Sequence, residues 1–135
     1  EELKQKTRDM NIEDNFILLN KAKDVRAVMK GLDIGVVASQ DSEVICRVAM
    51  EYMAMGIPVL ATDTNVLPEM IDNGNTGNIS PANNPQVMAE KVLELLDDRE
   101  KVRRMGAAAF ERAKEVFDRN AMVEKTLATY RNLIL

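Results

Sequence analysis

The stretch SEVICRVAMEYMAMGIPVLATD, residues 42–63, decides the fold, and two glutamates interrupt its otherwise apolar run. A helix is predicted from about Cys46 to Met55, because Gly56 ends it and Pro58 opens the next apolar run. That run, PVLAT at 58–62, is short and apolar, as expected of a buried strand. A helix that leads directly into such a strand is typical of a parallel sheet wrapped by helices.

The same alternation extends in both directions along the chain. Residues 1–10 carry a weak helical pattern, 15–20 (NFILLN) and 33–39 (DIGVVAS) are predicted strands, and 24–32 is a helix between them. Short extended segments are expected around the turn-rich 72–85. Three closing helices, 85–98, 99–117 and 118–135, are expected to cover one flank of the sheet, the last through a stripe of apolar side chains: Val123, Leu127, Tyr130 and Ile134. The fold class is therefore α/β, a parallel sheet flanked by helices in one domain, 1–135.

Composition excludes several functional classes. The 135 residues carry a net charge of −4 with no basic stripe, which argues against a nucleic-acid partner. The chain has no histidine, so no mechanism can take imidazole from it, and no apolar run reaches the ~20 residues of a membrane span. The single cysteine fits a reducing compartment, and we expect a cytoplasmic protein. The abrupt start without Met suggests a fragment, either cloned or processed.

Glu43, Arg47 and Glu51 are spaced at i, i+4 and i+8, and two interpretations stay open. They could form an ion-pair ladder on one helix face, worth a few tenths of a kcal/mol per pair. Alternatively they bind a ligand, because the helix looks apolar all round, hence buried, and buried charges need a reason. Arg47 could bridge the two glutamates or meet a diphosphate.

The position of these residues favours the ligand. The segment SQDSEVIC, residues 39–46, follows a predicted parallel strand and leads into a helix, where sheets of this kind bind ligands and where backbone amides favour phosphate. Eight helical residues rise about 12 Å, comparable to the span from the ribose to the hexose of a nucleotide sugar. Carboxylates are good acceptors for vicinal diols, so one acid at each end would suit such a ligand.

Four ordered motifs carry a resemblance to a known family. Glu43 is followed, after seven intervening residues, by Glu51-Tyr52-Met53-Ala54-Met55, then Gly56-Ile57-Pro58-Val59, then Pro68-Glu69, and then the turn Gly74-Asn75-Thr76-Gly77. This order resembles the C-terminal, donor-binding half of family 4 retaining glycosyltransferases (glycosyl transferases group 1), and the similarity covers nearly the whole chain. The resemblance implies a Rossmann-like domain, one half of a GT-B fold, that binds a nucleotide diphosphate sugar.

The resemblance also implies a role for each site residue. Glu43, the expected catalytic residue, would contact the donor sugar, and Glu51 would contact the ribose. The backbone amides of Val44, Ile45 and Cys46 would face the diphosphate, with Arg47 beside them. Leu19 and Asn20 would lie near the base. The leaving diphosphate would be stabilised by amides and cations, with no cofactor and no metal. The acid pair Asp41 and Glu43 resembles a metal-binding pair, but a solvated loop is the preferred interpretation.

Two stretches of the chain depart from the family pattern. Val44-Ile45-Cys46 replaces a Gly-Phe-Gly-like stretch, and Thr64-Asn65 replaces Gly-Gly. The family's phosphate-binding Arg and Lys, and its acceptor-binding domain, would precede residue 1, so the chain alone is expected to be inactive. The parent would transfer a hexose-like sugar to a sugar or lipid-linked acceptor, and peripheral membrane association would concern the parent only. The alternatives are half of a nucleotide-sugar epimerase, or a non-catalytic Rossmann-like binding or assembly module.

Overall fold

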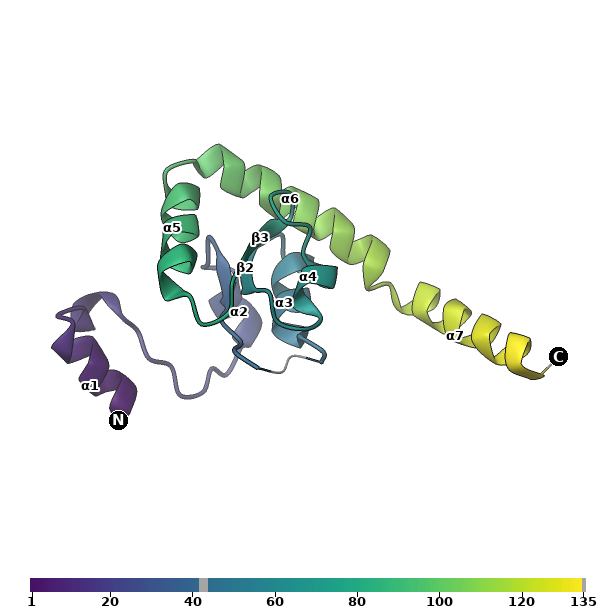
Figure 1. Cartoon of the computed structure of the whole chain (residues 1–135), viewed down its shortest axis with the longest axis horizontal. Helices are drawn as coiled ribbons and strands as arrows, with labels where there is room; N and C mark the ends of the chain where they lie inside the picture. The colour runs from purple at the N-terminus through teal and green to yellow at the C-terminus, as the bar shows by residue number, and fades with distance from the viewer. Residues whose placement is uncertain (42–43, 135) are drawn as a thin grey trace.

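The computed structural model describes residues 1–41 and 44–134, apart from the side chain of Ile134. The described residues form a three-stranded parallel sheet in the order β1 (Gly35–Val37), β2 (Val59–Thr62), β3 (Gly77–Ser80). The helices, in chain order, are α1 (Glu2–Asp9), α2 (Val25–Met29), α3 (Arg47–Ala54), α4 (Leu67–Met70), α5 (Pro85–Leu96), α6 (Arg99–Val116) and α7 (Arg119–Ile134), with a 3-10 turn at Glu13–Asn15 (Figure 1). The α/β arrangement with a parallel sheet is confirmed.

Local chemistry sets where the helices begin and end. The carboxylate of Asp24 and the amide oxygen of Asn84 accept hydrogen bonds from backbone N–H groups in the first turns of α2 and α5, each at 3.2 Å, and Asp98 does the same for α6 at 2.8 Å. Gly56 follows α3 with a φ of +70°, a conformation that glycine adopts without cost. These caps explain why the helix boundaries lie close to the predicted ones.

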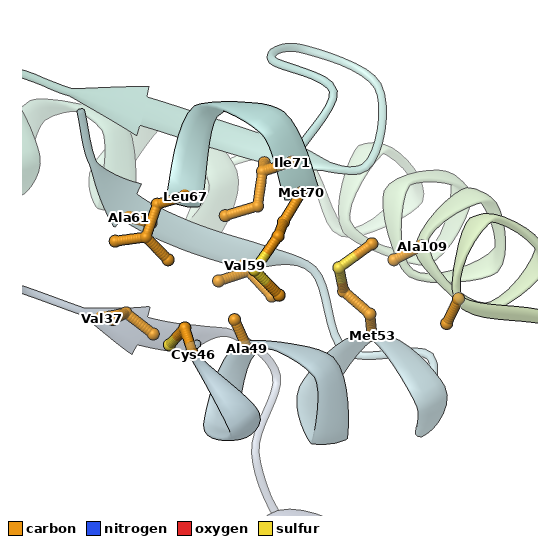
Figure 2. Packing of buried hydrophobic residues seen from close by; sticks show 11 residues of the cluster. Val37, Cys46, Ala49, Met53, Val59, Ala61, Leu67, Met70, Ile71 and Ala109 are labelled. Atoms are coloured by element: carbon orange, nitrogen blue, oxygen red, sulfur yellow. The ribbon is translucent and has the colours of Figure 1, made fainter. Parts of the chain in front are cut away.

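The two faces of the sheet are covered by different helices. Val37, Val59 and Ala61 point to the face that carries α3 and join the main buried cluster (Figure 2), listed with its other members as Cys46, Ala49, Met53, Leu67, Met70, Ile71, Ala109 and Ala113. Because side chains alternate along a strand, Leu60 and Thr62 point to the opposite face, where α5 contacts β2 and β3. The prediction that the three closing helices share one flank is therefore wrong. Helix α6 packs along α3, while α5 lies on the other face.

The last helix, α7, extends away from the sheet (Figure 1). The predicted apolar stripe is present, but Val123, Leu127 and Tyr130 are each about half exposed. An apolar period shows which face of a helix is apolar, and it carries no information on which surface covers that face. No helix in the described part of the chain is long and apolar enough to cross a membrane.

The predicted strand at 15–20 does not form. Residues 13–15 make the 3-10 turn, and residues 16–19 continue outside any ladder, with Ile17 84% and Leu19 62% exposed. A strand needs a neighbour to satisfy its backbone groups, and the sheet offers this segment none. The apolar composition was correctly recognised, but composition does not determine pairing.

Arg112, on α6, ties the short helix α4 to the body of the domain. Its Nε donates a hydrogen bond to the carbonyl oxygen of Met70 at 2.7 Å, and its Nη2 donates to that of Glu69 at 2.8 Å. Carbonyls at the end of a helix have no partner within the helix, so the guanidinium supplies one. The sequence gives no signal for this contact, because the partners lie more than 40 residues apart.

We expect Arg112→Met to lower the free energy of unfolding by about 1 to 2 kcal/mol, because it removes two charge-assisted hydrogen bonds and keeps the aliphatic stem. Urea denaturation followed by circular dichroism measures the loss. The matched control is Arg103→Met on the same helix, where an exposed ion pair with Glu100 contributes less than about 0.5 kcal/mol. Equal losses in the two variants would mean that Arg112 does not hold α4.

Candidate functional site

The candidate site lies where the chain leaves the carboxyl end of β1 and turns into α3. The carbonyl oxygen of Ser39 accepts hydrogen bonds from the hydroxyls of Thr62, at 2.6 Å, and Thr64, at 3.0 Å. Both threonines are buried: Thr62 ends β2, and Thr64 follows it two residues later. This hydroxyl pair fixes the start of the loop that leads to α3, at the sheet edge where open parallel sheets bind ligands.

The two residues that precede Cys46 are exposed. Val44 and Ile45 are 78% and 71% exposed, whereas the Cys46 side chain is 2% exposed and belongs to the core. Among the described residues, the backbone N–H groups of Val44 and Ile45 find no hydrogen-bond acceptor. Unpaired amides before a helix can donate hydrogen bonds to an anion, which the positive end of the helix also favours. Glu43, expected to be catalytic, lies outside the described residues.

Arg47 and Glu51 lie one turn apart on an exposed face of α3. The prediction that this helix is apolar all round and buried is therefore wrong: Ala49 and Met53 are buried, and Arg47, Glu51 and Ala54 face outward. The methionines and Val48 are apolar, but only one side of an eight-residue helix meets the sheet. Without burial, the two charges need no partner to offset desolvation.

No ion pair joins Arg47 to Glu51 in the part of the chain that the structure describes. The predicted ion pair of Arg47 with Glu51 is therefore not made. The other predicted pair, of Arg47 with Glu43, involves a residue outside the described part of the chain. Both side chains are available to a ligand. Arg47 lies at the first turn of α3, beside the exposed amides, so its charge adds to the positive end of the helix.

Glu51 lies between two hollows of the surface. One, of about 310 Å³, is lined by α2 and α3 residues: Val25, Arg26, Ala54 and Met55. The other, of about 290 Å³, lies between α3 and α6 and is mostly apolar: Met50, Ala54, Phe110, Ala113, Lys114 and Phe117. A carboxylate between two hollows can accept hydrogen bonds from a ligand that occupies either one.

The residue after Glu51 shows the electrostatic influence of this site. The Tyr52 ring lies across Gly35, where a Cβ would come within 2.6 Å of the ring Cγ. Burial raises the pKa of the Tyr52 phenol, and Cys46 and the negative charge of Glu51 raise it further. Tyr52 therefore stays neutral beside Glu51, so the negative charge of this part of α3 comes from the carboxylate.

The structure does not gather every predicted site residue. Val44 to Glu51 are contiguous in space because one loop and one helix carry them. Leu19 and Asn20, expected near a nucleotide base, are exposed in the unpaired 16–20 segment, and the two hollows that Glu51 lines contain neither of them. Within the described residues, no group of three histidine, cysteine, aspartate or glutamate side chains could hold a metal ion.

Two site-forming residues were missed by the sequence analysis, Thr62 and Thr64. Their signal is present: a hydroxyl that directly follows a buried strand lies at the carboxyl edge of a parallel sheet. Thr64-Asn65 occupies the position where the family resemblance implies Gly-Gly. Asn65 has a φ of +46°, a left-handed conformation that asparagine tolerates better than other non-glycine residues, so it can replace glycine there.

The sequence profile of the family described as Glycosyl transferases group 1 matches residues 1–112. Spore coat protein SA of Bacillus subtilis is 33% identical over 116 residues, 85% of this chain and 31% of that protein. N-acetyl-alpha-D-glucosaminyl L-malate synthase of Bacillus anthracis is 28% identical over 130 residues, 96% of this chain and 34% of that protein. The chain thus spans about a third of the length of these relatives.

Solved structures agree with the fold. The crystal structure of Anabaena HepE in complex with UDP matches with a TM-score of 0.88 at 24% identity, over 95% of this chain and 36% of that one. The C-terminal domain of a glycosyl transferase group 1 family protein from Francisella tularensis matches with a TM-score of 0.76 at 22% identity, over 87% of this chain and 62% of that one. At these identities the likeness establishes the fold, in agreement with the predicted half of a GT-B architecture.

Proposed function

The chain belongs to the family Glycosyl transferases group 1, and on this premise we propose that it is the donor-binding half of a two-domain retaining glycosyltransferase. The parent would transfer a hexose-like sugar from a nucleotide diphosphate sugar to a sugar or lipid-linked acceptor, without metal or cofactor. Both curated relatives described above are about three times as long as the chain, which leaves room for an acceptor-binding half. Carbohydrate biosynthesis in the cytoplasm is the proposed setting.

One observation carries this proposal: the unpaired amides of two exposed residues lie just before α3, and an arginine and a glutamate follow them on the exposed face of that helix. The amides of Val44 and Ile45 and the guanidinium of Arg47 would hold the diphosphate, since an anion gains both hydrogen bonds and the positive end of α3. Glu51 lies about 6 Å further along the axis, where its carboxylate would accept hydrogen bonds from the ribose hydroxyls.

The other predicted contacts complete the proposal. Glu43 would contact hydroxyls of the transferred sugar, and the buried Cys46 would contribute its backbone amide. Leu19 and Asn20, on the exposed 16–20 segment, would lie near the base. Charge that develops on the leaving diphosphate would be stabilised by the helix N-terminus and by Arg47, an electrostatic contribution to catalysis. The HepE complex contains UDP, which makes UDP the first nucleotide to test.

Calorimetry of the chain with UDP, GDP and ADP tests the proposal. We expect one of them to bind, and Glu51→Ala to weaken that binding about tenfold or more, because hydrogen bonds to a charged group contribute about 1.5 to 3 kcal/mol. Glu90→Ala, which removes an exposed glutamate from α5, is the control and should bind normally. If no nucleotide binds, or if Glu51→Ala binds as well as the control, the donor site is refuted and a non-catalytic module is favoured.

A further inference from the structure

One of the two hollows that Glu51 lines also carries a positive charge without a partner. It lies between α2 and α3, has a volume of about 310 Å³, and includes Arg26 of α2 in its wall. In the described part of the chain, the exposed guanidinium of Arg26 makes no hydrogen bond and no ion pair. A guanidinium and a carboxylate therefore line one hollow without pairing with each other, and both are available to a ligand.

The other hollow, between α3 and α6, offers a cation that is already engaged. Lys114 donates a hydrogen bond to the Glu111 carboxylate at 2.8 Å, and its Nζ lies 5.3 Å from the centroid of the Phe110 ring. A ligand there would have to replace contacts that the protein makes, whereas a ligand beside Arg26 would add its own. A ligand that extends from Glu51 is therefore expected to turn toward α2.

The backbone of Arg26 is held in place by the rest of α2. Met29, on the same short helix, is 4% exposed and anchors the helix to the domain. The Asp24 carboxylate accepts a hydrogen bond from the Ala27 backbone N–H at 3.2 Å, so this acid caps the helix. The Arg26 carbonyl oxygen accepts a hydrogen bond from the Lys30 N–H at 3.0 Å. Only the long side chain of Arg26 would have to be ordered by a ligand.

The hollow lies in the direction in which the proposed nucleotide would extend. Arg47, at the start of α3, is assigned above to the diphosphate, and Glu51 is assigned to the ribose. Ala54, which lines the hollow together with Met55, lies about 4.5 Å beyond Glu51 along the helix axis. The remaining part of a nucleotide is its base, which is joined directly to the ribose. The order phosphate, ribose, base therefore matches the order of these groups along α3.

The lining of the hollow suits a planar base. Val25 and Met55 offer apolar surface to the faces of a ring. The Arg26 guanidinium carries only hydrogen-bond donors, so it pairs with a carbonyl oxygen and has no acceptor for an amino group. Uracil and guanine carry carbonyl oxygens, whereas adenine carries an amino group and no carbonyl oxygen. The chemistry of this side chain therefore distinguishes between bases.

We propose that Arg26 is a specificity-determining residue of the donor site, which donates hydrogen bonds to a carbonyl oxygen of the base and so selects uracil or guanine over adenine. This inference rests on the proposed donor function, and it assigns the base to the hollow between α2 and α3. Val25 and Met55 pack against the ring. Arg26 contacts neither the diphosphate nor the ribose, so its effect depends on which base the nucleotide carries.

Calorimetry of the chain with UDP, GDP and ADP tests this through the ratios of the dissociation constants. We expect UDP or GDP to bind about fivefold or more tightly than ADP, and comparison of these two distinguishes uracil from guanine. Arg26→Met keeps the aliphatic stem and removes the donors. It should weaken binding of the preferred nucleotide about fivefold or more and leave ADP binding unchanged, which also shows that the variant is folded.

Arg103→Met, on α6, is the matched control and should leave all three affinities unchanged. The inference is refuted, and the donor proposal stands, if ADP binds as tightly as UDP and GDP. The same holds if Arg26→Met retains the preference, because the base is then selected by another group, or if it weakens all three nucleotides equally, because Arg26 then contacts the phosphates. If no nucleotide binds, the donor proposal itself is refuted, and this inference with it.

Discussion

Gly106→Ala is expected to destabilise the chain by about 3 kcal/mol or more, a large part of the 5 to 15 kcal/mol typical of a domain. Gly106 is buried in α6 where this helix crosses the end of α3. A Cβ at this position would fall inside the van der Waals contact of the Gly56 carbonyl oxygen, 3.2 Å from its carbon and 3.5 Å from Pro58 Cδ. The obstacle is backbone, so no side chain can rotate to make room.

Relief would require α6 to move away from α3, and the core lies between them. Ala109 and Ala113 of α6 pack in the same cluster as Met53 of α3, so a shift of the helix opens gaps around these side chains (Figure 2). Urea denaturation measures the loss. Gly31→Ala is the control, because a Cβ there meets only ordinary contact at 3.4 Å. A Gly106→Ala chain as stable as this control would show that α6 can separate from α3 at no cost.

Gly106 also shows what a single sequence can predict. Residues 99–117 are helical by period, as the structure confirms, although glycine inside a helix costs about 1 kcal/mol relative to alanine. That cost indicates that close packing is required, but it does not identify the partner, which lies 50 residues earlier at Gly56. The local pattern predicts the helices and strands. The contacts between them join residues that are far apart in the chain, and a local period does not identify such partners.

The errors in the predicted fold have the same origin. The runs 33–39 and 58–62 contain strands because they pair with each other in a parallel ladder. The run 15–20 is equally apolar, but it pairs with no strand of the sheet. The stripe of α7 is correct as a pattern and uncovered in the structure. For α3, the apolar composition overstated burial, because a valine and an alanine, Val48 and Ala54, also occupy the exposed side of the helix.

The relative placement of the candidate site residues could be predicted only where they are continuous along the chain. Val44 to Glu51 follow one another on one loop and one helix, so their relative placement comes from helical geometry alone. Leu19 and Asn20 belong to a different segment, whose position depends on long-range packing.

Gly77→Ala is expected to lower the free energy of unfolding as much as Gly106→Ala does, for a reason that the sequence does not reveal. In the sequence, Thr76-Gly77 reads as a turn, but the φ of Gly77 is not positive and the residue begins β3, opposite Val59 of β2. A Cβ there would overlap the Val59 carbonyl oxygen and lie 2.9 Å from its carbon and 3.0 Å from Ile71 Cγ2. The carbonyl belongs to the central strand, so moving it breaks the β2–β3 ladder. We expect a loss of about 3 kcal/mol or more.

Gly74 separates this close approach from turn strain, because it has a φ of +87° but open space around its Cα. Gly74→Ala should therefore cost only the left-handed penalty, about 1 to 2 kcal/mol, and Gly74→Asn less, since asparagine tolerates that conformation. At Gly77, asparagine should be no better than alanine, because both carry the Cβ that overlaps Val59. Urea denaturation compares the four variants Gly74→Ala, Gly74→Asn, Gly77→Ala and Gly77→Asn. Rescue by asparagine at both positions would show that Gly77 is a turn residue, and that the β2–β3 ladder does not require it.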